Sequence, residues 1–100
     1  MYYTYMLRCA DNSIYTGITV DLDRRLYEHK QKTEKCAKYT LNHEVIKLEV
    51  AWISKDRVLA AKLEYRIKKL NKFQKEELIK NNNMEELFKE KIDSSEYERV

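Results

Sequence analysis

Two segments near the start of the chain are rich in strand-forming residues. Tyr2–Cys9 and Ile14–Thr19 contain mainly Tyr, Thr, Ile, Leu and Met, and the residues between them are Ala-Asp-Asn-Ser. Strand formers on either side of a cluster of turn formers predict a β-hairpin. A third strand is predicted later in the chain, where every second residue is apolar and one face would be buried. Its apolar positions are Ile46, Leu48, Val50 and Trp52.

Other segments show helical spacing instead. A helix is predicted over 22–32, because its apolar positions recur at helical intervals and Asp21 is a good N-cap. Leu59, Leu63, Ile67 and Leu70 predict the inner stripe of a basic helix. We expect Asn71 to end or bend that helix and a further helix to cover about 73–80.

The order of these elements predicts a small α+β domain over residues 1–83. Its three-stranded sheet would consist of the N-terminal hairpin and the one later strand, flanked by helices. Residues 33–44 have no firm period and are interpreted as a loop with at most a helical turn. Residues 84–100 form an acidic tail, which can be an amphipathic helix through Met84, Leu87, Phe88 and Ile92 or can fray.

Charge is divided unevenly along the chain. Residues 1–80 carry 17 Lys and Arg against 11 Asp and Glu, whereas residues 81–100 carry 3 against 6. A basic body allows a polyanionic partner without requiring one, and a solvated surface is the simpler interpretation of a surplus of this size. No apolar run approaches the roughly 20 residues that span a bilayer, so we expect no membrane association. The sequence also lacks a signal-peptide pattern, and Cys9 and Cys36 fit free thiols, so we expect a cytoplasmic protein.

Several residues could carry chemistry. Tyr5 and Tyr15 lie in the two hairpin strands, and Gly17, the only glycine of the chain, follows the second tyrosine. Arg25 and His29 are one helical turn apart and share a helix face. Taken singly, the tyrosines could simply fill a core, and the glycine could mark a bulge or a close backbone approach.

Glu64 is the other residue of this kind. It is the sole carboxylate between Asp56 and Glu76, in a helix rich in lysine. Ion pairing is the ordinary role of such a carboxylate, and metal binding is the alternative.

The length of the hairpin loop decides whether the two tyrosines can act together. A two-residue loop would place them on opposite faces of the sheet. A three-residue loop, Asp11-Asn12-Ser13, would pair Tyr5 with Thr19 and place both tyrosines on one face. A bulge would have the same effect. We expect one of these, with the hydroxyl groups on the same face as Arg25 and Glu64.

Together these residues resemble the GIY-YIG nuclease family. Tyr3-Thr4-Tyr5 stands at the first triplet of the family's motif and Tyr15-Thr16-Gly17 at the second, while Arg25, His29 and Glu64 match its helix residues and its glutamate. The chain is most similar to small bacterial GIY-YIG proteins, in the stretches CADNSIYTGITVDLDRRLYEH, AKYT and LEYRIKKL. The resemblance covers about residues 2–80. The first triplet lacks the family's glycine and isoleucine, and the family's downstream asparagine has no clear match.

The resemblance implies a phosphodiesterase site with one divalent metal ion, Mg²⁺ or Mn²⁺, held by Glu64. Arg25 would donate to the phosphate oxygens. Tyr5 would be the general base or would orient the attacking water. Tyr15 would hold water or phosphate, and His29 would position or relay a proton. Gly17 would let phosphate or a helix approach the strand.

Binding residues are also implied. Lys35, Lys38 and Tyr39 would line a substrate groove, and Lys68 and Lys72 would contact phosphates. The substrate would be DNA that is branched, damaged or bound without sequence preference, in repair or recombination. The alternative function is a non-catalytic module that binds nucleic acid or a repair protein, with a vestigial site. The sequence carries no information on the oligomeric state.

Overall fold

A four-stranded antiparallel sheet forms the centre of the protein, in the order β2-β1-β3-β4. The computed structural model describes residues 1–31 and 43–100. The strands are β1 (Tyr2–Cys9), β2 (Ile14–Thr19), β3 (Val45–Ser54) and β4 (Glu98–Arg99). The α+β class and the first three strands are confirmed. The fourth strand was not predicted, because two residues at the end of an acidic segment carry no strand pattern.

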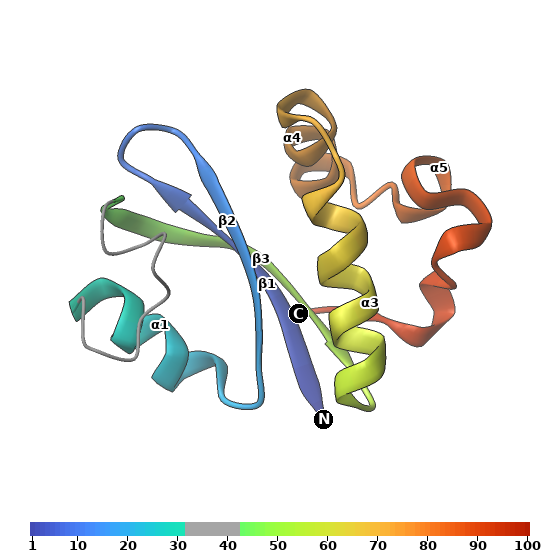
Figure 1. Cartoon of the computed structure of the whole chain (residues 1–100), viewed down its shortest axis with the longest axis horizontal. Helices are drawn as coiled ribbons and strands as arrows, with labels where there is room; N and C mark the ends of the chain where they lie inside the picture. Colours follow the sequence, from blue (N-terminus) through green and yellow to red (C-terminus); the bar gives the residue numbers. More distant parts are fainter. Residues whose placement is uncertain (32–42) are drawn as a thin grey trace.

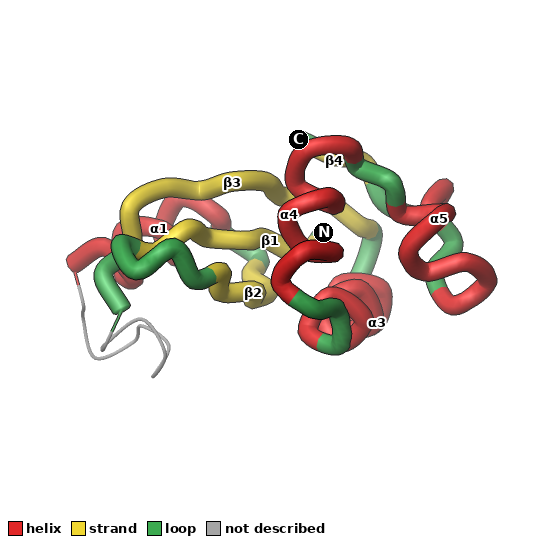
Figure 2. The backbone as a smooth tube through the Cα atoms, turned by 90° about the horizontal axis from the view of Figure 1, so that it is seen from above, coloured by secondary structure: helices red, strands yellow, loops and turns green. Residues whose placement is uncertain are grey.

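Helices cover both faces of this sheet (Figures 1 and 2). On one face lies α1 (Leu22–Gln31), and on the other lie α3 (Arg57–Lys68), α4 (Lys72–Asn81) and α5 (Met84–Phe88). The core therefore has two parts. Beneath α1, Leu22 and Leu26 pack on a cluster that includes Tyr5 and Leu7. The larger part, on the other face, contains Met6, Val50, Trp52, Leu63, Ile67 and Leu78.

The hairpin loop has three residues, as expected, but it begins one residue earlier than predicted. The Cys9 amide donates to the Ser13 carbonyl at 2.9 Å, which leaves Ala10, Asp11 and Asn12 as the loop. Asn12 takes a positive φ of 70°, which asparagine tolerates better than most residues. Tyr5 therefore pairs with Gly17 and not with Thr19. The shift of the loop keeps the parity of the register, so both tyrosines still point to one face.

The third strand departs from simple alternation. The pairing of β1 with β3 shifts between Met6 and Leu7, where Met6 faces Val50 and Leu7 faces Leu48. This bulge moves Leu48 into the cluster under α1, while Val50 stays in the larger core. Ile46 is 55 % exposed. The prediction that all four alternating residues share one buried face is therefore wrong, because a bulge reverses the faces that follow it.

Side-chain caps fix the helix boundaries. The Asp56 carboxylate accepts from the Leu59 amide at the start of α3. Asn71, where a break was expected, caps α4 and forms a reciprocal capping box with Gln74. The break at Asn71 is confirmed. It follows from this competition between the asparagine side chain and the helical backbone.

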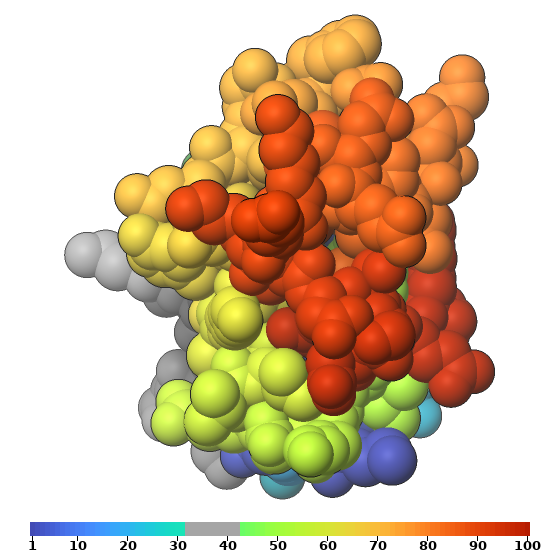
Figure 3. Space-filling view, turned by 90° about the vertical axis from the view of Figure 1, so that its right-hand side faces the viewer, coloured from blue at the N-terminus to red at the C-terminus, as the bar shows by residue number. Residues whose placement is uncertain are grey.

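Residues 84–100 pack against the helical face of the core (Figure 3). Their buried residues are Met84, Phe88, Ile92 and Tyr97. The Tyr97 hydroxyl donates to the Leu59 carbonyl at 2.6 Å, and the Val100 amide donates to the Ala51 carbonyl at 2.9 Å. These contacts make the acidic segment part of the same core as α3 and α4.

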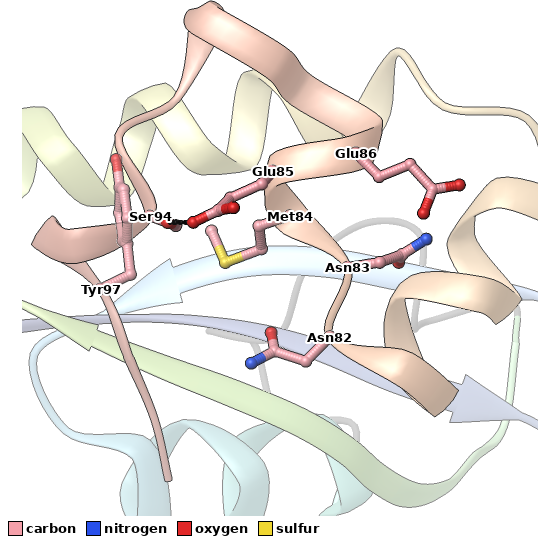
Figure 4. A pocket seen from close by; sticks show the side chains of 7 residues that line it. All are labelled: Asn82, Asn83, Met84, Glu85, Glu86, Ser94 and Tyr97. Carbon is pink, nitrogen blue, oxygen red and sulfur yellow. Dashed lines mark hydrogen bonds between the residues drawn. The ribbon is translucent and has the colours of Figure 1, made fainter.

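A cavity of about 450 Å³ lies where this segment leaves α4 (Figure 4). In its wall the Ser94 hydroxyl donates to Glu85 at 3.1 Å. Of the residues expected at the nuclease-like site, none that falls within 1–31 or 43–100 lines it. Among the described residues, no helix is long and apolar enough to cross a membrane.

The two phenylalanines of the chain test the role of the C-terminal segment. Phe88 is 4 % exposed and Phe73 is 71 % exposed. We expect Phe88→Ala to lower the free energy of unfolding by about 3–5 kcal/mol, because it opens a cavity in the core. Phe73→Ala is the matched control and should change it by less than about 0.5 kcal/mol. Urea unfolding measures both, and similar values for the two variants would contradict the packing described here.

Candidate active site

Two tyrosines lie close together on the α1 face of the hairpin. The ring centroids of Tyr5 and Tyr15 are 6.3 Å apart. Tyr5 is 1 % exposed, and Tyr15 is half-buried. The strand register confirms the prediction that the side chains of Tyr5 and Tyr15 lie on the same face of the sheet.

Gly17 is directly opposite Tyr5 in the ladder, and the Tyr5 ring lies over it. A β-carbon at this position would be 2.6 Å from the Tyr5 hydroxyl oxygen and 2.8 Å from its Cζ atom. It would also be 3.0 Å from Cε2 of Tyr15. The only glycine of the chain therefore leaves room for the buried tyrosine, whereas the sequence had suggested room for phosphate or a helix.

His29 projects from α1 onto the same tyrosine. Its Nε2 atom is 2.8 Å from the Tyr5 hydroxyl oxygen, and the imidazole is fully buried. Burial, with the nearby positive charge of Arg25, lowers the pKa of His29 to about 4. The ring is therefore neutral at pH 7, so Nε2 can accept the hydrogen bond that the phenol donates.

The Tyr5 phenol is held in its protonated form. Burial raises its pKa well above the ordinary value, and the neighbouring Tyr15 adds to this rise. A hydrogen bond from Arg25 opposes the rise. The Tyr5 oxygen thus lies between a cationic donor and a neutral acceptor, which is an arrangement that can pass a proton.

Arg25 reaches the tyrosines from α1. Its Nη1 atom also donates to the Glu28 carboxylate at 3.0 Å. Glu28 was not singled out from the sequence, although its i,i+3 spacing from Arg25 was a usable signal. This carboxylate holds the guanidinium in place beside the phenol.

Glu64 approaches from the other side of the sheet. It belongs to α3, which covers the face opposite α1 and lies next to the edge strand β2 (Figure 2). Its carboxylate is 3.2 Å from the Lys68 ammonium, which in turn lies 6.0 Å from the centroid of the Tyr15 ring. Its negative charge also helps to raise the Tyr5 pKa. Glu64 is thus near the tyrosines, although the backbone of α3 covers the other face of the sheet. That its carboxylate lies on the same face as Arg25 stays a prediction.

Glu64 offers one carboxylate to a hard cation. No group of three His, Cys, Asp or Glu side chains that could hold a metal occurs within 1–31 and 43–100. A Mg²⁺ ion often uses only one or two carboxylates, with water and substrate phosphate as its other ligands. The half-buried Glu64 carboxylate can supply that protein ligand.

The remaining predicted residues are divided between two places. Lys68 and Lys72 lie at the end of α3 and the start of α4, and the Lys72 ammonium donates to the Asn12 carbonyl of the hairpin loop. Lys35, Lys38 and Tyr39 fall outside the described residues, so their predicted role in a groove stays a prediction.

Replacement of Gly17 tests the contact with Tyr5. A glycine-to-alanine change at a permissive position usually stabilises a protein by about 0.4–1 kcal/mol. We expect the opposite sign here, a loss of about 1–3 kcal/mol, because the new methyl group displaces a buried ring. Urea unfolding of Gly17→Ala measures the change. A gain in stability would contradict the close approach of the ring.

The protonation of His29 gives a second test. Because the pKa of about 4 in the folded protein is below the ordinary 6.5, the unfolded chain binds the proton first. The contribution of His29 to stability is therefore complete above about pH 6.5 and is lost as the pH falls toward 4. We expect the imidazole NMR signals of His29 to stay those of a neutral ring from pH 7.5 to 5. A titration midpoint near 6.5 would show that the ring is solvated.

Comparison with known proteins shows which family the chain resembles. Residues 1–77 match the GIY-YIG catalytic domain. UPF0213 protein FN1575 of Fusobacterium nucleatum is 47 % identical over 78 residues, which cover 78 % of this chain and 76 % of that protein. UPF0213 protein YhbQ of Salmonella arizonae is 46 % identical, with the same coverage.

A solved structure adds a further relative. The solution NMR structure of UPF0213 protein BH0048 from Bacillus halodurans is 33 % identical, with a TM-score of 0.48. It covers 89 % of this chain and 95 % of that one. The match over residues 1–77 and the 47 % identical relative show that the chain belongs to the GIY-YIG nuclease family.

Proposed function

We propose that this protein is a metal-dependent endonuclease that hydrolyses phosphodiester bonds in DNA. The observation that carries the proposal is the buried hydrogen bond between Tyr5 and His29, with the Arg25 guanidinium on the same phenol. A proton acceptor, a proton carrier and a phosphate-binding cation thus meet at one point. The substrates we propose are branched, damaged or non-specific DNA, in repair or recombination in the cytoplasm.

The chemistry begins with the phosphate group. Arg25 offers planar donors to its non-bridging oxygens, where negative charge grows during the reaction. A divalent ion bound by Glu64 supplies Lewis-acid stabilisation of the phosphate and of the leaving oxygen. The residues that would hold the phosphate and the ion, Arg25 and Glu64, belong to α1 and α3.

Proton transfer involves Tyr5 and His29. As water forms its bond to phosphorus and the bond to the leaving oxygen breaks, the Tyr5 oxygen takes a proton from the water. The phenol proton passes at the same time to Nε2 of His29. In the free protein both pKa shifts oppose this transfer. A bound phosphate favours it, because the negative charge stabilises the imidazolium.

The ion pair between Glu64 and Lys68 does not prevent metal binding. It is an i,i+4 pair in which the side chains are 23 % and 53 % exposed. Such solvent-screened pairs contribute only about 0.3–0.5 kcal/mol. A divalent ion can therefore replace the lysine as the partner of the carboxylate.

Glu64→Ala tests the metal ligand. We expect cleavage to fall by about 10² or more, because the ion that stabilises the reacting phosphate loses its protein ligand. The free energy of unfolding should change by less than about 1 kcal/mol, since the carboxylate makes only a partly exposed ion pair. The assay uses branched, nicked and single-stranded DNA with Mg²⁺ and with Mn²⁺, and titration calorimetry measures metal binding.

Glu86→Ala is the matched control for Glu64→Ala, because it removes an exposed carboxylate of α5 that lies outside the candidate site. Unchanged cleavage and unchanged metal affinity in Glu64→Ala would refute the assignment. DNA binding without cleavage by the unmodified protein would instead favour a non-catalytic binding module.

Two adjacent arginines test the phosphate contact. We expect Arg25→Lys to reduce cleavage about 10²-fold, because lysine keeps the charge but loses the planar fork. Arg24 is exposed and projects about 100° away on the helix, so Arg24→Lys should be close to neutral. Steady-state cleavage rates measure both. Equal losses would mean that general positive charge matters and the specific contact does not.

A further inference from the structure

A second hollow of about 390 Å³ lies beside the hairpin loop, outside the tyrosine site. It is formed where the loop meets the start of α4. The residues that line it are Asp11, Ser13, Ile14, Lys72 and Lys75. Its two lysines come from one helical turn, and its hydroxyl group comes from the hairpin.

The placement of these lysines is electrostatically costly. Lys72 and Lys75 lie in the first turn of α4, which has no acidic residue. The N-terminus of a helix carries partial positive charge, so cations there are unfavourable and anions are favourable. The capping box of Asn71 and Gln74 satisfies amide groups but adds no negative charge.

Lys75 is the most strained of these charges. It is half-buried, and no ion pair joins it to any of the residues described. Burial lowers its pKa, and the neighbouring ammonium groups of Lys68 and Lys72 lower it further. Three ammonium groups thus repel one another, and Lys75 has no carboxylate partner among the residues described. A bound anion would reduce this repulsion.

Lys72 is held in position by a network. Its ammonium donates to the Asn12 carbonyl and lies 3.6 Å from Glu76. Glu76 is fixed in turn by two hydrogen bonds of 2.6 Å from Arg8, which also donates to Glu49 at 2.8 Å. This charged network links the hairpin loop, β3 and α4, and it therefore fixes the position of Lys72 at the hollow.

The one carboxylate in the lining, Asp11, is already engaged. Its Oδ1 atom accepts from the Ser13 hydroxyl and amide, and its Oδ2 atom lies 2.6 Å from Nδ1 of His43. These interactions engage its oxygens within the loop region, so Asp11 does not pair with Lys75.

We propose that this hollow is a subsite for a backbone phosphate of nucleic acid, with Lys72 and Lys75 as its cationic contacts. The inference rests on the proposed function and adds to it the path of the bound strand. Lys68 connects the two places, because its ammonium lies 6.0 Å from the centroid of the Tyr15 ring and its charge also acts on Lys75. A strand that places one phosphate at the tyrosines can place a later phosphate beside the hairpin loop.

The test measures DNA binding in EDTA, so that cleavage plays no part. Each phosphate contact adds about 0.9 to the slope of log affinity against log salt for duplex DNA. Lys75→Gln should lower that slope by about 0.9 and weaken binding severalfold at low salt. Lys80→Gln, about one and a half turns further along α4 and exposed, is the matched control and should leave both values unchanged. Equal effects of the two variants, or none, would overturn the proposal.

A second measurement separates a backbone phosphate from free phosphate. NMR signals of Ser13, Lys72 and Lys75 are followed while inorganic phosphate or an oligonucleotide is added. Saturation by the oligonucleotide at far lower concentration supports the proposal. Saturation by inorganic phosphate, with DNA affinity unchanged in Lys75→Gln, overturns it. If Lys75→Gln has no effect while Glu64→Ala still abolishes cleavage, the subsite is refuted and the proposed nuclease function is retained.

Discussion

The ring of Tyr5 lies across Gly17, and the rest of the candidate site depends on this contact. Because the position opposite Tyr5 has no side chain, the ring can lie flat against β2 and still reach α1. The Tyr5 hydroxyl oxygen is therefore 2.8 Å from Nε2 of His29, and the His29 side chain is buried beside it. The three-residue hairpin loop makes the contact possible, since it sets the register that pairs these two residues.

Burial has opposite consequences for the two partners. It raises the pKa of the phenol and lowers the pKa of the imidazole, so both are neutral at pH 7. In the proposed mechanism, the pair is stable in the resting protein and becomes reactive when charge arrives with the substrate. Arg25 contributes to this balance through its hydrogen bond to the phenol. The folded protein thus holds Tyr5 and His29 in a hydrogen bond while the tyrosine stays protonated.

Local signals in the sequence predicted the hairpin and the three longer helices, and the resemblance to the GIY-YIG family pointed to the residues that meet at the tyrosines. They could not predict the bulge that moves Leu48 to the other face, because nothing in an alternating pattern marks an extra residue. They also missed β4, because its partner β3 is far from it in the chain and the two meet only once Phe88 and Tyr97 pack in the core. The position of Glu64 at the sheet edge likewise follows from how α3 packs, which is a tertiary property.

The coupling of Tyr5 and His29 can be measured with a double-mutant cycle on the cleavage rate. The variants are Tyr5→Phe, His29→Gln and the two combined, each checked for folding. If the two residues share one proton, the double variant should be no slower than the slower single variant. Losses that add on a logarithmic scale, or single variants that cleave at the normal rate, would contradict the account.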